Sequence, residues 1–256
     1  MSMQPLMLMP GLMRCSTQME YIGRGMDNMS SIRLLRGDCN LKLENIPNHS
    51  IDLVIMDPPY LQTGSAGSGA FGGEHRNYYN ELSCMSHGIS NETLDLILSK
   101  LKRINIYIYC NKKQIQQYLN YFIPKGVNFD LLCWHKLNPI PATNNIYLRD
   151  SEYILFFREK GVKLYGSYQT KKTYFLSGIN LKDKNRFDHP TVKPLDQIKT
   201  FIENSSLPGD TVLDPFMGTG TTGVGCKQMG RSFVGIEIEN RYFNTARERI
   251  RSAARE

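Results

Sequence analysis

Short runs of apolar residues alternate along this chain with longer stretches in which apolar residues recur every three or four positions. That alternation is typical of an α/β fold, in which helices cover a mostly parallel sheet. The short runs predict seven strands, at residues 32–36, 51–56, 104–109, 129–134, 152–157, 211–213 and 232–236. The amphipathic stretches predict helices at residues 92–102, 112–122, 193–204, 221–229 and 240–253, with Ser90 or Asn91 as the first N-cap and Asn240 as the last.

Two stretches without this periodicity interrupt the pattern. Residues 61–90 are rich in glycine, and residues 161–188 combine basic with aromatic side chains. Long loops inside a compact α/β domain are usually functional or mobile. We therefore expect one domain at residues 32–256 that carries two irregular insertions.

The N-terminal segment differs in composition from the rest of the chain. Eight of the 12 methionines fall within the first 29 residues, and the first predicted strand begins at Ile32. Residues 1–31 are therefore predicted to be an extension outside the folded core. Their apolar part, residues 5–13, has no preceding Lys or Arg and is broken by Pro10 and Gly11, which differs from a secretory signal. We expect the protein to be cytoplasmic.

Composition excludes several classes of protein. With 41% hydrophobic and 21% charged residues the chain lies in the ordinary globular range, which argues against disorder. It has no run of roughly 18 uninterrupted apolar residues, so an integral membrane protein is excluded. The six cysteines are scattered singly without a Cys-x-x-Cys pair, so we expect reduced thiols and no metal site.

The formal net charge of +7 is concentrated in the middle of the chain. Residues 91–140 hold seven basic and three acidic side chains, and residues 161–190 hold six basic and two acidic ones. Such a surface would attract a polyanion, but a basic face that only aids solubility gives the same count. Charge alone therefore leaves nucleic-acid binding open.

The tetrapeptide Asp57-Pro58-Pro59-Tyr60 directly follows the predicted strand at 51–56. In an open α/β sheet the carboxyl ends of the strands border the ligand crevice, so this tetrapeptide is expected at the site. Two consecutive prolines have a fixed φ and no N–H, so they hold the neighbouring groups stiffly. A plain turn is the alternative, since Asp-Pro often starts one.

A second motif begins at Asp214 and continues through Phe216, Gly218 and Gly220 to Thr221, between a predicted strand and a predicted helix. A strand, a glycine-containing turn and a helix together form a nucleotide-binding unit. An acid directly after the strand would repel a pyrophosphate and attract a cation. Glu237 ends the next predicted strand, where a carboxylate can accept hydrogen bonds from both ribose hydroxyls. Together these acids favour a ligand that contains adenosine and an amino group.

In this order the two motifs, with His189-Pro190-Thr191-Val192-Lys193-Pro194 just before the second, resemble the S-adenosylmethionine-dependent DNA amino-methyltransferases. The order is similar to that of the β group, in which the catalytic tetrapeptide precedes the target-recognition region and the cofactor motif comes last. The resemblance covers residues 32–253. It implies a class I methyltransferase fold, that is, a seven-stranded, mostly parallel, doubly wound, Rossmann-like sheet with circularly permuted motif order.

The resemblance also implies roles for individual residues. Asp57 and the Pro58 carbonyl would accept hydrogen bonds from the exocyclic amine of a flipped base, on which Tyr60 would stack beside Pro59. The cofactor is expected to be S-adenosylmethionine. The residues that would surround it are Asp38 and Cys39 at the adenine, Glu237 at the ribose, and Thr191, Lys193, Asp214, Phe216, Gly218, Gly220 and Thr221 around its methionine part.

Target recognition would fall to residues 161–188, with help from the loop at 61–90. The predicted DNA contacts there are Lys163, Lys171, Lys172, Lys182, Lys184 and Arg186. Trp134 is expected to serve packing more than the base pocket. The resemblance makes double-stranded DNA the expected partner and is compatible with a cognate restriction endonuclease and with a homodimer.

Aspartate at the first position of the tetrapeptide is commoner among the adenine-N6 enzymes of the family, so we expect an adenine-specific methyltransferase. Three alternatives stay open at this point. They are cytosine-N4 methylation, methylation of RNA or of a protein amide, and a catalytically silent nucleic-acid-binding module on the same fold. Loss of Asp57 or of the glycines would favour the last alternative, and all of them are present.

Overall fold

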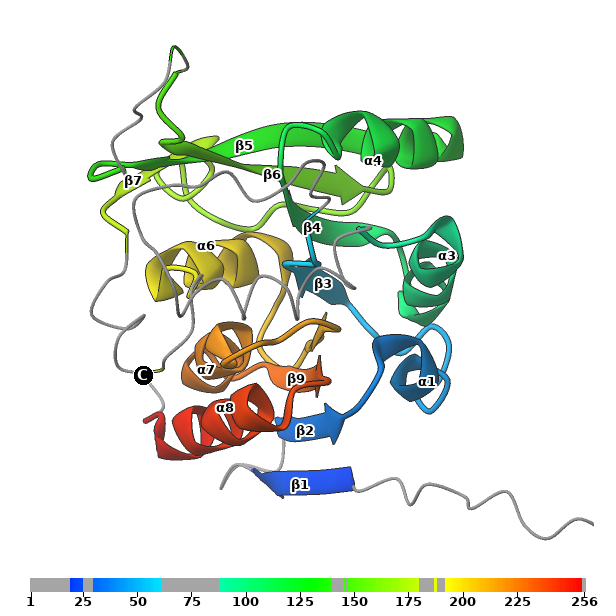
Figure 1. Cartoon of the computed structure of the whole chain (residues 1–256). Coiled ribbons are helices and arrows are strands. Elements are labelled where there is room, and N and C mark those ends of the chain that lie inside the picture. The colour runs from blue at the N-terminus through cyan, green and yellow to red at the C-terminus, as the bar shows by residue number, and fades with distance from the viewer. Residues whose placement is uncertain are drawn as a thin grey trace, which may run out of the picture.

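A single mixed sheet runs through the protein in the order β1-β2-β9-β8-β3-β4-β6-β5-β7 (Figure 1). The computed structural model describes residues 19–24 (backbone only), 30–60, 88–139, 145, 147–179, 187 and 192–254. The strands are β1 (Met19–Arg24), β2 (Ser31–Arg36), β3 (Leu53–Met56), β4 (Asn105–Cys110), β5 (Asn128–Lys136), β6 (Ser151–Arg158), β7 (Tyr174–Ser177), β8 (Thr211–Asp214) and β9 (Ser232–Glu237).

The direction of the strands decides which residues share an edge of the sheet. Strands β2, β9, β8, β3 and β4 are parallel, so their carboxyl ends lie at one edge. Strand β6 pairs antiparallel with β4 and with β5, so the beginning of β6 and the end of β5 reach that same edge. We call it the carboxyl edge.

Helices cover both faces of this sheet, as a doubly wound fold requires (Figure 1). On one face the buried side chains of α6 (Leu195–Ser205), α7 (Thr221–Gln228) and α8 (Asn240–Ser252) join one apolar core. On the other face those of α1 (Cys39–Leu43), α3 (Asn91–Lys100) and α4 (Ile115–Phe122) join a second. A short 3-10 turn, η2 (Ile123–Lys125), follows α4. Among the described residues no helix is long and apolar enough to cross a membrane.

All seven predicted strands and all five predicted helices are present, with ends that differ by a few residues. Ser90 is the N-cap of α3, because its hydroxyl accepts a hydrogen bond from the Thr93 amide at 3.3 Å. The predicted cap at Asn240 is wrong. Asn240 is the first residue of α8, and its side chain instead accepts a hydrogen bond from Arg36 Nη1 at 3.0 Å.

Besides the 3-10 turn η2, three elements in the described part of the chain were not predicted. Helix α1 spans only five residues. Strand β7 lies within the insertion at 161–188 and pairs parallel with β5 at the end of the sheet. Strand β1 pairs antiparallel with β2, with Met19 opposite Leu35. The assignment of residues 1–31 to an extension outside the core stays a prediction.

Helix α6 is fastened to the middle of the sheet by aromatic contacts. The Tyr107 ring of β4 stacks between Phe156 and Phe201, at centroid distances of 4.1 and 4.3 Å. The Tyr109 hydroxyl donates to Gln197 Oε1 at 2.8 Å. Offset stacking adds to the stabilisation from burial alone. Because α6 is held in this way, the residue two positions before it, Lys193, lies at the carboxyl edge.

Candidate active site at the carboxyl edge

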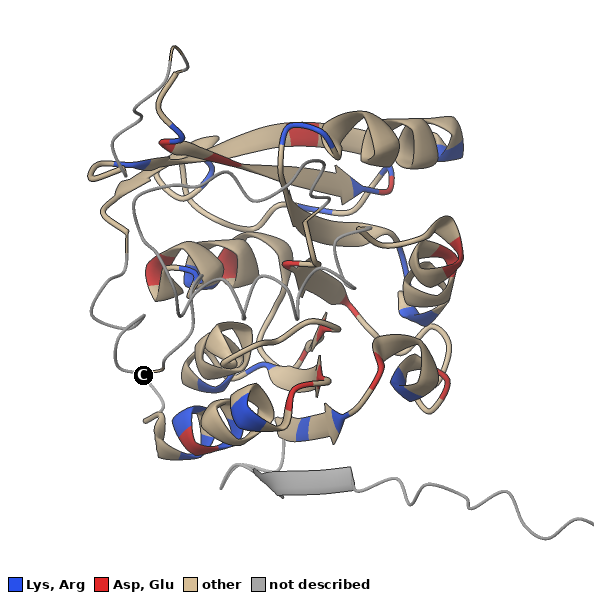
Figure 2. Cartoon of the chain, in the orientation of Figure 1, with Lys and Arg blue, Asp and Glu red and all other residues tan. Residues whose placement is uncertain are grey.

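A cavity of about 580 Å³ opens at the carboxyl edge, between the ends of β2, β3, β8 and β9. This volume is in the range of pockets that hold small molecules. Figure 2 shows acidic residues, in red on the ribbon, where β3, β8 and β9 end. The cavity lining contains most of the predicted site residues, namely Asp38, Cys39, Asp57, Pro58, Pro59, Tyr60, Lys193, Asp214, Phe216, Gly218, Thr221 and Glu237. Thr191 lies outside the described residues.

Glu237, the last residue of β9, presents a fixed carboxylate to the cavity. Its two oxygens accept hydrogen bonds from the backbone amides of Gly218 and Glu239, at 2.9 and 2.8 Å. Burial raises the pKa of Glu237 above its ordinary value, and the hydrogen bonds from these amides oppose the shift only in part. The side chain can still accept further hydrogen bonds, because each carboxylate oxygen has a second lone pair. This carboxylate therefore suits a ligand with neighbouring hydroxyl groups, such as a ribose.

The turn between β8 and α7 needs glycine at two positions, for different reasons. Gly218 has φ +50°, and its amide reaches Glu237. Gly220 has φ +81°, and a Cβ there would lie 2.8 Å from the Cβ of Ala246 on α8. Gly220 is therefore required for helix packing, and it is not part of the cavity lining.

Asp214 is buried below this turn and holds it together. Its carboxylate accepts hydrogen bonds from the Thr222 hydroxyl at 2.6 Å and from the Phe216 amide at 3.1 Å. Burial raises its pKa from 3.8 to about 7, although both hydrogen bonds oppose the shift. Without a bound cation, the folded protein therefore favours the protonated form of Asp214 below neutral pH.

This pKa leads to a prediction about stability. A carboxyl group whose folded pKa is raised stabilises the fold at low pH, and that contribution is lost as pH rises from about 4 to about 7. The loss is on the order of 4 kcal/mol. Asp214→Asn should remove this dependence. Thermal unfolding without cofactor measures the stability difference between the variant and the wild type. This difference should favour the variant more at pH 8 than at pH 5. The same difference at both pH values would contradict the prediction.

Asp38 and Cys39 lie on the far side of the cavity, where β2 leads into α1. Asp38 is the N-cap of α1, and its Oδ1 accepts hydrogen bonds from the Asn40 and Leu41 amides at 2.9 and 3.3 Å. Burial and the neighbouring Asp38 charge raise the pKa of the Cys39 thiol to about 11. The thiol is therefore uncharged at neutral pH and acts as an apolar part of the wall.

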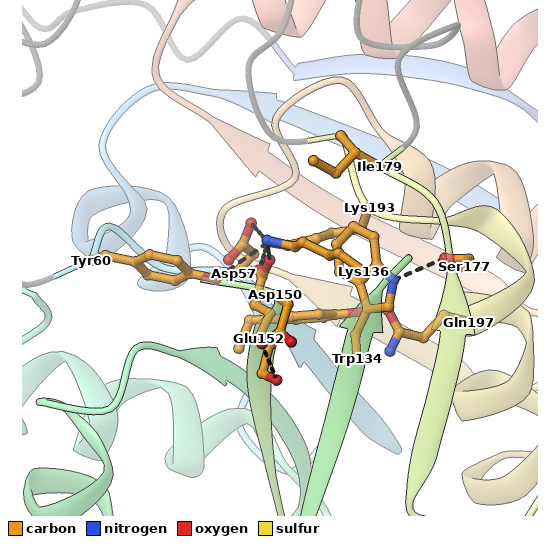
Figure 3. Close-up of polar contacts among 12 residues, drawn as sticks. Asp57, Tyr60, Trp134, Lys136, Asp150, Glu152, Ser177, Ile179, Lys193 and Gln197 are labelled. Atoms are coloured by element: carbon orange, nitrogen blue, oxygen red, sulfur yellow. Dashed lines mark hydrogen bonds and ion pairs between the residues drawn. The ribbon is translucent and has the colours of Figure 1, made fainter. Parts of the chain in front are cut away.

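The tetrapeptide at 57–60 joins a cluster of charged side chains (Figure 3). Asp57 Oδ2 lies 3.0 Å from Lys193 Nζ. Asp57 Oδ1 is buried and has no hydrogen-bond partner among the described residues. Burial raises the pKa of Asp57, and the Lys193 ammonium opposes this shift. An unpaired buried acceptor is costly, which suggests that a ligand donates to it.

Glu152, the second residue of β6, is at the centre of this cluster and was not predicted as a site residue. Its Oε1 accepts hydrogen bonds from Tyr60 Oη and Lys193 Nζ, and its Oε2 lies 2.9 Å from Lys136 Nζ. Burial alone would raise the pKa of Glu152, but the two ammonium groups reverse the shift and hold it at about 2. One sequence signal could have identified it: an acid at the start of a strand that is otherwise apolar.

The backbone of the tetrapeptide is held from the other face of the sheet. The side chain of Gln114, which is fully buried, donates from Nε2 to the Pro59 carbonyl at 3.3 Å. Its Oε1 accepts a hydrogen bond from the Asn111 amide at 3.2 Å. The prolines and this contact restrict the segment that carries Asp57.

Lys193 lines the cavity, and its ammonium group contacts Asp57, Glu152 and Tyr60. Its predicted role at the carboxylate of the cofactor stays a prediction. Trp134 is buried in the core and donates from Nε1 to the Ser177 hydroxyl at 2.8 Å, in agreement with a packing role (Figure 3).

None of the predicted DNA-contacting lysines that the structure describes lines the cavity, and Thr170, just before Lys171, accepts from Asn204 near the end of α6 remote from the carboxyl edge. Lys163 is exposed and follows Val162, whose carbonyl accepts from Arg158 at the end of β6 opposite to the carboxyl edge. Lys171 and Lys172 are exposed just before β7. Lys182, Lys184 and Arg186 lie outside the described residues, as does the loop at 61–87.

Several proteins of known family are similar to this chain in sequence. Residues 51–248 match the family model described as DNA methylase, which covers the N6 and N4 enzymes. The chain is 32% identical to the type II methyltransferase M.HinfI of Haemophilus influenzae, over 85% of this chain and 68% of that protein. It is 30% identical to the type II methyltransferase M2.LlaDCHI of Lactococcus lactis subsp. cremoris, over 86% of this chain and 90% of that protein.

Solved structures agree with the sequence comparisons. The complex of M1.HpyAVI with S-adenosylmethionine aligns with a TM-score of 0.64 at 26% identity, over 86% of this chain and 98% of that chain. The PvuII DNA methyltransferase, which is cytosine-N4-specific, aligns with a TM-score of 0.64 at 16% identity, over 89% and 95%, and shows the shared fold alone. The chain therefore belongs to the N6/N4 DNA methylase family and is a site-specific DNA amino-methyltransferase that uses S-adenosylmethionine.

Proposed function

We propose that this enzyme methylates the N6 amine of adenine in double-stranded DNA, after flipping the base out of the helix. One observation carries the proposal. Asp57 Oδ1 is a buried acceptor without a partner among the described residues, and Asp57 lines the same cavity as Glu237. An exocyclic amine would supply the missing donor.

The residues of the tetrapeptide would prepare this amine for reaction. Bound S-adenosylmethionine supplies an activated methyl group. Asp57 Oδ1 and the Pro58 carbonyl would each accept one hydrogen bond from the amine. These two bonds withdraw the nitrogen lone pair from the ring and direct it toward the methyl group. The new nitrogen–methyl bond would form as the sulfur–methyl bond breaks, the neutral thioether would leave as S-adenosylhomocysteine, and the methylated amine would release one proton to solvent. Alignment and electrostatics then suffice, without a covalent enzyme intermediate.

Base flipping follows from the burial of the acceptor. The Asp57 side chain is 25% exposed, and its free oxygen is buried. An amine stacked inside a duplex cannot reach such an atom, so the base would have to leave the stack. The Tyr60 ring, with its hydroxyl held by Glu152, would provide a stacking surface of fixed orientation.

Contacts to the DNA backbone are proposed for the basic segment that contains Lys171 and Lys172, both exposed. The assignment of Lys163, Lys182, Lys184 and Arg186 to DNA binding also stays a prediction, and Lys163 lies near the end of β6 opposite to the carboxyl edge. A homodimer and a partner endonuclease also stay predictions.

The choice of adenine rests on Asp57 as the first residue of the tetrapeptide. Cytosine-N4 is the competing target, since it also offers an amine beside a ring nitrogen, and one neighbour of the same fold is cytosine-N4-specific. We expect tritium transfer from labelled S-adenosylmethionine to DNA, followed by nucleoside chromatography, to give N6-methyladenine. Recovery of N4-methylcytosine would overturn the choice of base, and the absence of any labelled nucleoside would overturn the proposed reaction.

A further inference from the structure

Glu152 contacts the reactive groups of the site from behind. Its side chain is 10% exposed and touches Tyr60, Lys193 and Lys136, but Glu152 is not part of the cavity lining. Asp57, Tyr60 and Lys193 all line the cavity. Glu152 therefore reaches the substrate side of the site only through other residues.

The Lys193 ammonium group lies between Glu152 and Asp57, and each of its three N–H donors has an acceptor. An ammonium group has three N–H donors. Those of Lys193 face Glu152 Oε1, Asp57 Oδ2 at 3.0 Å and Tyr60 Oη at 3.2 Å, and the nitrogen lies 4.7 Å from the centroid of the Tyr109 ring. Burial would lower the pKa of Lys193, but the two carboxylates raise it, so the group stays charged.

These contacts make the surroundings of the two Asp57 oxygens different. Oδ2 is held by Lys193, whereas Oδ1 is buried without a partner among the described residues, on a side chain that lines the cavity. The second ammonium, on Lys136, brings the cluster to two positive and two negative charges. A buried group of charges is tolerated when it is paired and hydrogen-bonded throughout.

We propose that Glu152 is the positioning residue of this active site: it fixes the Lys193 ammonium against one oxygen of Asp57, and it fixes the Tyr60 hydroxyl at the same time. This inference rests on the proposed function, because it assigns to Asp57 the binding of the target amine. Glu152 thereby determines the orientation of both the acceptor and the stacking ring. It takes no part in the reaction itself.

The variant Glu152→Gln keeps the size of the side chain and removes its charge. We expect kcat to fall about 100-fold, because a misplaced acceptor near the reacting atoms costs this much. The Kd for S-adenosylmethionine, measured by calorimetry, should change less than about twofold, since Glu152 does not line the cavity. The matched control is Glu159→Gln, just past the other end of β6, where Glu159 pairs with Arg103 at 3.2 Å. Its kcat should be unchanged.

A double-mutant cycle separates positioning from a structural role. If Glu152 acts through Lys193 and Tyr60, only the contact with Tyr60 is left to lose in the Lys193→Met background, so adding Glu152→Gln there should lower kcat by about tenfold or less. The full 100-fold loss in that background would overturn the proposal. So would an unchanged kcat in Glu152→Gln alone, or a loss of cofactor affinity equal to the loss of kcat.

A second pair keeps the test decisive if Glu152→Gln fails to fold. Glu152→Gln with Lys136→Met removes one charge of each sign, so the net charge of the cluster is kept, while Lys193 loses the carboxylate that fixes it against Asp57. This pair should bind S-adenosylmethionine as the wild type does and show the same loss of kcat, and full activity would refute the inference. Failure of the proposed function would appear in the wild type, as methylation of another base or of none.

Discussion

Replacing Asp57 by alanine should abolish methyl transfer, with kcat lower by about 10³-fold or more, while the protein still binds S-adenosylmethionine. The variant removes the one buried carboxylate oxygen that has no hydrogen-bond partner in the described part of the chain. It also leaves Lys193 with Glu152 and Tyr60 as its remaining described polar partners. Because Asp57 is paired with Lys193 while Glu237 is hydrogen-bonded to the Gly218 and Glu239 amides, the Kd for the cofactor should change less than about threefold.

Single-turnover methyl transfer and calorimetry together test this prediction. Asp57→Asn is the isosteric companion and should lose nearly as much activity, since its amide oxygen carries no full charge. Asp52→Asn is the matched control. Asp52 precedes β3 at the opposite edge of the sheet, where it pairs with Lys102 at 2.8 Å. Lost cofactor affinity with retained turnover would contradict the role of Asp57.

The strands of the sheet could be predicted because most of them are buried on both faces. All six residues of β4 and all six of β9 are buried, so each appears in the sequence as an apolar run. Strand β7 could not be predicted in the same way. It is short, lies at the end of the sheet, and alternates exposed with half-buried residues. A basic, aromatic segment with such a pattern does not differ from an irregular loop.

The site residues that follow parallel strands could be predicted from their place in the sequence alone. Asp57, Asp214 and Glu237 each lie at or directly after the carboxyl end of such a strand. Glu152 lies at the beginning of an antiparallel strand, so only the pairing of β4 with β6 reveals that it belongs to the same edge. The contacts of Lys193 could not be predicted either, because its partner Glu152 is 41 residues away.

Replacing Glu237 by alanine should have the opposite effect to Asp57→Ala and weaken cofactor binding. We expect the Kd for S-adenosylmethionine to rise about 100-fold, as for the loss of a charged acceptor of two hydroxyl groups. At saturating cofactor, kcat should stay within about threefold of the wild type. Glu237 accepts hydrogen bonds from the Gly218 and Glu239 amides, whereas Asp57 contacts Lys193. Replacing Glu237 should therefore leave the contacts of Asp57 in place.

Glu237→Ala also leaves the Gly218 and Glu239 amides without their acceptor. A higher Kd of this variant therefore has two explanations, a lost contact with the ligand or a disordered turn. Glu237→Gln resolves this, since its amide oxygen still accepts from one backbone amide while the negative charge is lost. Its thermal stability should be closer to that of the wild type than the stability of Glu237→Ala, with Kd still raised about tenfold. Glu248→Gln on α8, where the side chain is 60% exposed, is the control for loss of one acid. An unchanged Kd in Glu237→Gln combined with a large loss of kcat would place Glu237 with the reacting groups and not with the ribose.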